Sequence, residues 1–297
     1  MKFNCTIKLH NLLRLIICMP LFVFGQFESC DVDSTVKSIE NIDYASFGDK
    51  KVQLDLYMPK KTGIYPGVIL VHGGGWTSGT KLGFTQMAID LAEKGYVVAN
   101  IDYRLAAEAI FPGAVQDTKA AIRWLRANAK TYNINPNKIA GIGASAGGHL
   151  IAMAALTGHT NKFNGSSGNH DNVSGVLQAT IIMGSGVDQV TRVKNAPDQY
   201  VKNCFIFFGG SFADKHEVYA NASPINHISH NMTPILMLDG GQDKPGERYV
   251  DFRKKLDNHN VINEFKIIPD AKHGQWKKDR FRSAYTKAFD SFLKKHL

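Results

Sequence analysis

The sequence predicts an α/β fold in which helices flank a mostly parallel central sheet. Short apolar runs alternate with stretches of helical periodicity along most of the 297 residues, as expected of strands joined by crossover helices. The run at 65–71 is apolar throughout, which suits a strand buried on both faces. A strand pattern also passes directly into a helix pattern at Gly143-Ala144-Ser145-Ala146-Gly147. With 44% hydrophobic residues, the chain is long enough for one large domain.

Residues 1–25 have the pattern of a cleavable secretory signal. Lys2, Lys8 and Arg14 form a basic region, and an apolar run at 15–24 leads to small residues before Gln26. A single membrane anchor is the alternative, but the run is shorter than the ~20 residues that a spanning helix needs. We therefore expect a secreted or periplasmic protein with no membrane span after cleavage. Its single domain is expected to cover residues 26–297.

Charge and cysteine content limit the partners. The formal net charge is +9, and it falls to +6 without the three basic residues of the signal. The remaining basic residues are interleaved with acids on expected helices, so solvated helix faces explain them better than a nucleic-acid groove. We expect no nucleic-acid partner, and the sequence leaves the oligomeric state open.

Cys30 and Cys204 remain after signal cleavage and are candidates for a disulfide in an oxidising exterior.

The expected elements follow in chain order. Alternating residues on both sides of Gly48-Asp49-Lys50-Lys51 predict an N-terminal antiparallel hairpin. The segment at 184–232 is rich in Asn, Asp and Pro, so we expect an irregular insertion, a cap over the sheet edge that forms part of the substrate cleft. Hydrophobic periodicity places further strands at 65–71, 96–101, 139–144, 176–183, 234–238 and 261–268, and helices at 84–94, 112–130, 146–156, 246–258 and 276–297.

Ser145, at the predicted turn between strand and helix, is the candidate nucleophile. A serine hydroxyl needs a base within hydrogen-bond reach, and the base needs a carboxylate that orients it. Functional residues of open α/β sheets gather at the carboxyl ends of strands. His273 and Asp243 each lie in a loop after a predicted strand, and we expect them to be the base and the acid. Asp239 and Asp270 are the rival acids, and Asp243 is preferred because of its position within its loop.

A glycine-rich loop follows the strand at 65–71. Residues without side chains let backbone N–H groups approach a developing oxyanion closely, and one such donor can be worth ~3 kcal/mol in the barrier. We expect the N–H groups of Gly73 and Gly74 to form the oxyanion hole together with that of Ala146, which follows the serine.

Three aromatic residues lie beside these motifs in the sequence. Trp76 follows the glycine loop, Tyr103 follows the strand at 96–101, and Trp276 follows the candidate base. We expect them to shape the acyl and alcohol pockets. Core packing is an equally good interpretation of Tyr103.

These motifs resemble those of the α/β-hydrolase superfamily, in the branch of carboxylesterases, acetyl esterases and hormone-sensitive-lipase-like enzymes that carry HGGG. Within this branch the chain is most similar to bacterial feruloyl and acetyl-xylan esterases. One departure is Ala144 before the serine, where related sequences often carry Asp, Glu or Gly. The resemblance runs from about Tyr44 to Phe292 and rests on HGGGW (72–76), DYRL (102–105), FPGAVQD (111–117), AIRWLRANA (121–129), GASAGGHL (143–150), ASPINHIS (222–229), GGQD (240–243) and KHG (272–274).

The resemblance implies an α/β-hydrolase fold and a serine hydrolase of carboxylic esters that works through an acyl-enzyme, with no metal and no cofactor. The sequence agrees on the metal, because it has no HExxH motif and no paired CxxC motifs. The expected substrate is a small ester or an acetyl or feruloyl group on a plant or algal polysaccharide. An arylformamidase-like or peptidase-like amide hydrolase on the same triad is the first alternative. A non-catalytic binding protein on this fold is the second, and the presence of Ser145 and His273 disfavours it.

Overall fold

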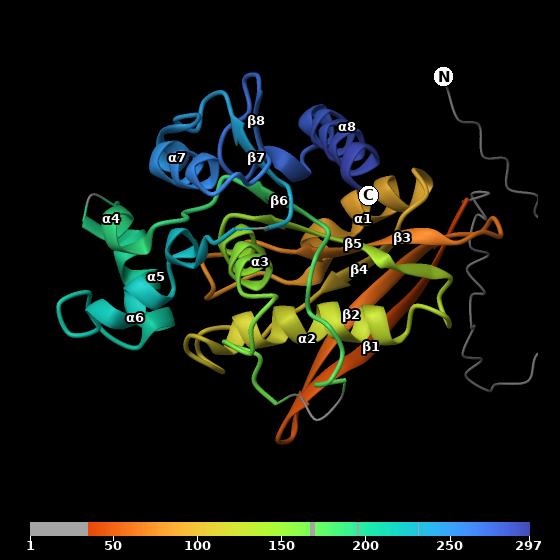
Figure 1. Ribbon diagram of the computed structural model, residues 1–297, viewed down its shortest axis with the longest axis horizontal. Coiled ribbons are helices and arrows are strands. Elements are labelled where there is room, and N and C mark those ends of the chain that lie inside the picture. Colours follow the sequence, from red (N-terminus) through yellow and green to blue (C-terminus); the bar gives the residue numbers. More distant parts are fainter. Residues whose placement is uncertain (1–34, 167–169, 195, 231) are drawn as a thin grey trace, which may run out of the picture. The chain divides into compact units, whose positions relative to one another are not determined.

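A central sheet organises the chain in the computed structural model, which describes residues 35–166, 170–194, 196–230 and 232–297. The described residues contribute eight strands in the order β1-β2-β4-β3-β5-β6-β7-β8 (Figure 1). β1 pairs antiparallel with β2 and β2 antiparallel with β4, whereas all other neighbours are parallel. This confirms the mostly parallel sheet and the N-terminal hairpin. The strands are β1 (Val36–Phe47), β2 (Lys50–Pro59), β3 (Tyr65–Val71), β4 (Val97–Ile101), β5 (Ile134–Ala144), β6 (Ala179–Met183), β7 (Ile235–Gly240) and β8 (Asn263–Ile268).

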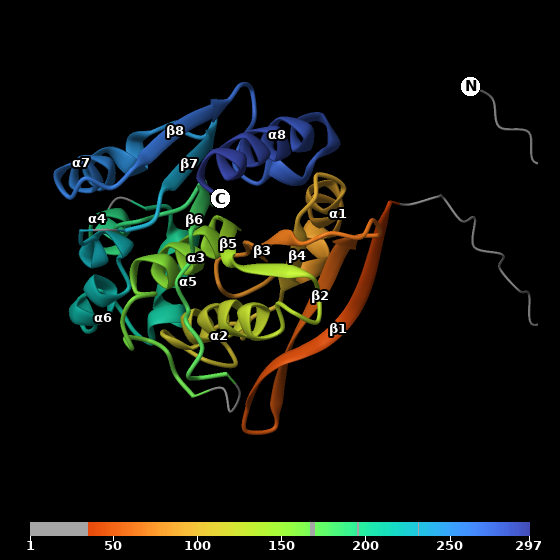
Figure 2. The same cartoon turned by 45° about the vertical axis from the view of Figure 1, so that its right-hand side comes forward.

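Helices cover both faces of the sheet (Figure 2). Leu91 of α1 and Phe289 of α8 belong to one buried apolar cluster, whereas Leu125 of α2 and Met153 of α3 belong to a second. Each face of the sheet therefore has its own core, which confirms the flanking helices. The helices are α1 (Thr85–Glu93), α2 (Gly113–Ala127), α3 (Ala146–Leu156), α4 (Gln189–Lys194), α5 (Asp198–Phe208), α6 (His216–Asn221), α7 (Val250–Asn258) and α8 (Asp279–His296), with short 3₁₀ helices at Lys81–Phe84, Pro224–His227, Glu247–Tyr249 and Gln275–Lys277.

The periodicity of α2 shows how the sequence sets these packing faces. Val115, Ile122 and Leu125 recur at helical spacing and are fully buried in the same apolar cluster. The helix ends at Ala127, three residues before the end that the periodicity predicts. Its buried face holds it against the sheet and beside α3.

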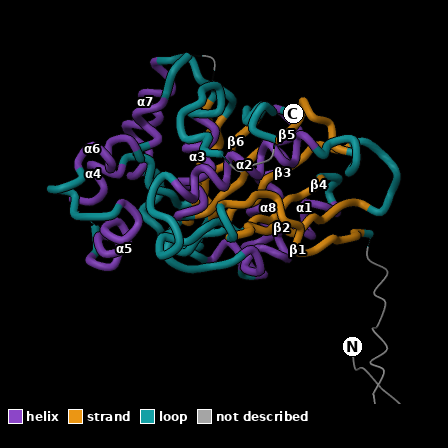
Figure 3. The backbone as a smooth tube through the Cα atoms, turned by 90° about the horizontal axis from the view of Figure 1, so that it is seen from below, coloured by secondary structure: helices purple, strands orange, loops and turns teal. Residues whose placement is uncertain are grey.

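The described part of 184–232, expected to be irregular, contains the three short helices α4, α5 and α6 between β6 and β7. Figures 1 and 3 show them together at one end of the sheet, away from α1 and α8. Local contacts begin and end them. Asp188 Oδ1 accepts hydrogen bonds from the N–H groups of Val190 and Thr191, and Gly209 ends α5 in the left-handed conformation. α4 and α6 have six residues each and span too few turns for periodicity to predict them, whereas α5 has 11 residues and the expectation of an irregular segment was wrong there.

Parallel pairing brings the ends of distant strands to one edge of the sheet. Val71 at the end of β3 is in register with Gly143 of β5, which is in register with Ile182 of β6. Gly240 at the end of β7 is in register with Ile268 of β8. The loops that follow these strands therefore lie at the same edge, where ligands bind in open α/β sheets.

Several predictions concern the N-terminal region and its surroundings. The expected signal at 1–25 and Cys30 lie outside the described residues, so the secretory signal and the disulfide stay predictions. Cys204 is buried, and burial raises the pKa of its thiol to about 12.

Residues 35–297 form one compact unit. In that described portion, no helix combines the length and the apolar character that crossing a bilayer requires.

Candidate active site

Ser145 occupies a tight turn between β5 and α3. Its backbone has φ 52° and ψ −118°, which a residue other than glycine rarely adopts. The glycines on both sides make room for this turn. A Cβ at Gly143 would lie 2.2 Å from the carbonyl oxygen of Gly147, and a Cβ at Gly147 would lie 2.2 Å from that of Val71. The GxSxG spacing is therefore a steric requirement of the turn.

The structure brings the three predicted triad residues together. His273 Nε2 lies 3.0 Å from Ser145 Oγ, and His273 Nδ1 lies 2.8 Å from Asp243 Oδ2. These distances allow the imidazole to accept the serine proton while the carboxylate fixes its orientation. Ser145 follows β5, Asp243 follows β7 and His273 follows β8, so the parallel sheet assembles residues that lie far apart in the sequence.

The two rival acids are not hydrogen-bonded to the histidine, although Asp239 lies 3.5 Å from Nε of Arg248, which also contacts Asp243. Asp239 is buried at the end of β7, where its Oδ2 accepts a hydrogen bond from the N–H of Gly246 at 2.8 Å, and burial raises its pKa. Asp270 is exposed, with Arg280 3.9 Å away as its ion-pair partner. Of the three candidate carboxylates, Asp243 is the one in hydrogen-bond contact with the histidine.

Arg248 contacts the candidate acid from the side opposite to the histidine. Its Nη2 lies 2.9 Å from Asp243 Oδ1, and its Nη1 donates to the Gly184 carbonyl oxygen at 3.0 Å. Burial acts to raise the pKa of Asp243, but the hydrogen bond from His273 and the Arg248 charge outweigh it and hold that pKa below its usual value. Arg248 was not predicted from the sequence, although its position five residues after Asp243 placed a cation within reach of the same loop.

Ser185 supports the nucleophile's turn from the loop after β6. Its Oγ donates to the backbone carbonyl oxygen of Ser145 at 2.8 Å, and its N–H donates to the hydroxyl of Tyr249 at 2.9 Å. Both residues are buried, and the sequence analysis assigned neither of them. Ser185 could have been predicted as a site residue, because it lies two residues after the strand predicted at 176–183, at the edge where functional residues gather.

The glycine loop lies against the nucleophile. A Cβ at Gly73 would be 2.9 Å from the Ala144 carbonyl oxygen and 3.2 Å from the Cβ of Ser145. Within the described part of the chain, the N–H groups of Gly73 and Gly74 donate no backbone hydrogen bond. Ala146 is the first residue of α3, where helix N–H groups lack an intrahelical partner. An oxyanion hole made of these three N–H groups stays a prediction.

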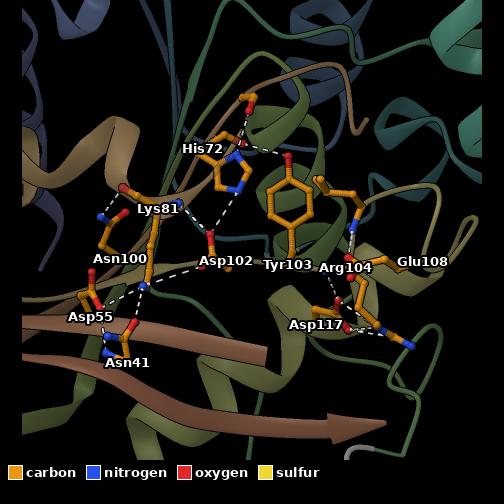
Figure 4. Close-up of polar contacts among 12 residues, drawn as sticks. Asn41, Asp55, His72, Lys81, Asn100, Asp102, Tyr103, Arg104, Glu108 and Asp117 are labelled. Atoms are coloured by element: carbon orange, nitrogen blue, oxygen red, sulfur yellow. Dashed lines mark hydrogen bonds and ion pairs between the residues drawn. The ribbon is translucent and has the colours of Figure 1, made fainter. Parts of the chain in front are cut away.

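A buried polar network holds the start of this loop (Figure 4). The Tyr103 ring stacks on His72 with centroids 4.3 Å apart, and the Tyr103 hydroxyl donates to the His72 carbonyl oxygen at 3.2 Å. Asp102 lies 3.8 Å from His72 Nε2 and accepts the Lys81 N–H at 2.7 Å. Lys81 Nζ continues the network to Asp55 Oδ1 at 3.2 Å. Asp102 and Tyr103 of the DYRL motif thus support the start of the glycine loop at His72.

The three aromatic residues differ in their surroundings. Trp76 is buried, stacks on Phe207 at 4.8 Å and donates from Nε1 to His149 at 3.2 Å. The Trp276 ring meets the His273 ring edge-on, with centroids 4.9 Å apart. Tyr103 is buried in the network under the glycine loop. Their predicted roles as pocket walls stay predictions.

A cavity of about 500 Å³ adjoins the triad. His273 and Asp243 form part of its wall, and the remaining lining comes from the loop after β6, from α4 and from the region of α7. Its volume lies within the range of ~300–1,000 Å³ that is usual for small-molecule sites. Among the described residues, this cavity included, no group of three or more His, Cys, Asp or Glu side chains is placed to hold a metal ion.

Comparisons with known proteins show the family to which the chain belongs. The family model described as BD-FAE matches residues 54–256, which is more than half of the chain. The chain belongs to the BD-FAE family. A curated relative, "Esterase LipC" of Mycobacterium tuberculosis (strain ATCC 25618 / H37Rv), is 33% identical over 247 residues. The match covers 77% of this BD-FAE chain and 58% of LipC, so the chain spans less than two thirds of that relative.

Two solved structures are similar to this BD-FAE protein in both fold and sequence. A truncated carbohydrate esterase from gut microbiota is 27% identical, with a TM-score of 0.78 over 89% of this chain and 98% of that one. A bifunctional GH43-CE protein of Bacteroides eggerthii is also 27% identical, with a TM-score of 0.77 over 87% of this chain and 35% of the other. These neighbours confirm the α/β-hydrolase fold.

Proposed function

We propose that this chain is a serine esterase that hydrolyses carboxylic esters through an acyl-enzyme. The observation that carries the proposal is the continuous contact from Ser145 through His273 to Asp243, at 3.0 Å and 2.8 Å. Esterase activity in LipC and the carbohydrate-esterase identity of a structural neighbour support the same reaction class.

In the first step of the proposed reaction, His273 Nε2 takes the proton of Ser145 Oγ as the oxygen attacks the ester carbonyl carbon. The N–H groups of Gly73, Gly74 and Ala146 hold the oxyanion that forms. His273 then gives its proton to the departing alcohol, and an acyl group stays on Ser145. Water attacks the acyl carbon with His273 as the base, which releases the acid and restores the serine. The His273 side chain is 42% exposed, so this water has access to it.

The proposed substrate is an acetyl or feruloyl ester, on a plant or algal polysaccharide or on a small alcohol. Membership of the BD-FAE family and the two carbohydrate-esterase neighbours support this class. Secretion, inferred from the pattern at 1–25, would bring the protein to such a polymer. Trp76, Tyr103 and Trp276 stay proposals for pocket walls, and none of them lines the cavity beside His273.

Activity of Ser145→Ala on 4-nitrophenyl acetate and acetylated xylan tests the proposal. We expect activity on both substrates to disappear while thermal unfolding remains that of the wild type. Ser283→Ala is the matched control, because Ser283 is exposed on α8. Full activity in Ser145→Ala would refute the proposal. Methyl ferulate, N-formylkynurenine and an aminoacyl anilide, assayed with the wild type, separate esters from the amide alternatives.

A further inference from the structure

The cavity beside His273 has a lining of mixed character. Charged groups of both signs line it from α4, α7 and the segments before them: Asp188, Arg192, Lys244, Glu247, Arg248 and Asp251, besides Asp243 and His273. Val187, Ala196, Pro197, Ile225 and Phe252 form apolar wall between these charges. Hydroxyl groups both donate and accept hydrogen bonds, and a sugar ring also has apolar C–H faces. The lining therefore matches a sugar better than an alkyl chain, which needs apolar walls, or an anion, which needs an excess of cations.

Among the lining residues, Arg192 gives the strongest indication of ligand binding. Its guanidinium carbon lies 4.5 Å from the centroid of the Tyr200 ring, which holds the side chain in place. Gly186 leaves room for it, since a Cβ there would lie 2.6 Å from Arg192 Cδ. Its Nε is buried, and the Tyr200 side chain contacts the guanidinium. Because the guanidinium is already held in one position at the cavity wall, it loses little conformational freedom when it binds a ligand.

The proposed reaction decides which part of the ester enters this cavity. The leaving alcohol receives its proton from His273 Nε2, so its oxygen must lie at the histidine. The acyl oxygen faces the glycine loop on the Gly73 side of Ser145. The cavity is lined by His273 and Asp243, whereas neither Ser145 nor the loop at 72–76 contributes to it. It begins at the histidine, away from the glycine loop, so the part of the ester that can extend into it is the leaving alcohol, whose oxygen lies at His273.

We infer that this cavity is a subsite for the sugar of the leaving group, in which Arg192 and Asp251 bind its hydroxyl groups. The inference rests on the proposed esterase function and adds the part of the substrate that these residues select. Through Arg192, the helix α4 of the insertion takes part in substrate binding. Through Asp251, so does the first turn of α7.

Two acetyl esters that differ only in the alcohol test this inference: methyl 2-O-acetyl-β-xylopyranoside and 4-nitrophenyl acetate. For Arg192→Gln and for Asp251→Asn, we expect kcat/KM on the xyloside ester to fall about tenfold more than on 4-nitrophenyl acetate. The extra loss should appear mainly in KM. Methyl β-xylopyranoside, the free alcohol, should inhibit 4-nitrophenyl acetate hydrolysis competitively and more weakly in both variants. Arg253→Gln is the control, because Arg253 is exposed on α7 and is not part of the lining.

Equal losses on both esters, or an unchanged xyloside reaction, would overturn the subsite. A selective loss on methyl ferulate relative to methyl acetate would also overturn it, by assigning the cavity to the acyl group. A failure of the proposed function looks different. In that case the wild type itself does not hydrolyse the acetylated xyloside. That result refutes the proposed esterase function, whereas the results above refute the subsite alone.

Discussion

Arg248 Nη2 lies 2.9 Å from Asp243 Oδ1, while the other oxygen of the same carboxylate lies 2.8 Å from His273 Nδ1. Asp243 is thus held between a permanent cation and the proposed base. Arg248 also donates to the Gly184 carbonyl oxygen at 3.0 Å, so it joins the loops after β6 and β7. We assign it a positioning role, in which it acts on the reaction through Asp243.

Arg248→Gln should lower kcat/KM about tenfold, because it removes a hydrogen bond between charged groups. It should also move the acid limb of the pH profile to higher pH. Loss of the cation raises the pKa of Asp243, so this carboxylate takes up a proton at higher pH and the active form persists over a narrower acid range. Arg248→Lys retains the charge and should keep more of the wild-type profile. An unshifted acid limb in Arg248→Gln would show that Arg248 has only a structural role.

Asp243→Asn should reduce kcat about a thousandfold or more, since an amide neither stabilises the imidazolium nor fixes the same tautomer. Steady-state hydrolysis of 4-nitrophenyl acetate measures this loss. Asp270→Asn is the comparison, because Asp270 is exposed and makes only a long ion pair with Arg280. The assignment of the acid would be wrong if Asp270→Asn caused the larger loss.

Tyr103→Phe should lower kcat about three- to tenfold with KM close to that of the wild type. The change keeps the stack on His72 but removes the hydrogen bond to its carbonyl oxygen, so the following glycine N–H groups are held less firmly. Tyr96→Phe is a matched control that loses a hydrogen bond to Asp290, far from the site in the fold. Equal kinetic effects of the two variants would contradict a role for Tyr103 in holding the loop.

Gly147→Ala should destabilise the fold by about 1–3 kcal/mol and reduce activity. Its Cβ would lie 2.2 Å from the Val71 carbonyl oxygen, and the turn that carries Ser145 must move to relieve the overlap. Urea unfolding and hydrolysis of 4-nitrophenyl acetate report the two effects. Gly83→Ala adds a methyl group where no heavy atom lies within 4 Å, and it should change neither. Wild-type stability in Gly147→Ala would contradict the steric account of the turn.

The sequence was sufficient to predict features that repeat along the chain. The fully apolar β3 and the periodic face of α2 predicted a parallel sheet with flanking helices. Because loops after parallel strands meet at one edge, it also predicted that Ser145, Asp243 and His273 lie together, and the distances agree. Their catalytic roles stay predictions.

Sequence patterns of this kind do not predict contacts that a single side chain makes with a distant part of the fold. Arg248 lies in a charged stretch, and its partners at Asp243 and Gly184 depend on how two loops meet. Tyr103 supports the glycine loop through one hydroxyl, which no periodicity records. The short helices of the insertion form through local caps such as Asp188, and Arg192 reaches the cavity only once α4 is in place.

The central claim is that Ser145 forms the acyl-enzyme, and rapid acid quenching followed by peptide mass spectrometry tests it most directly. After brief mixing with 4-nitrophenyl acetate, the account predicts an acetyl group on Ser145. The label should be absent from Ser145→Ala and retained in Ser283→Ala. Rapid turnover with no acetyl group on Ser145, or with the acetyl group on another residue whose replacement stops turnover, would contradict the account.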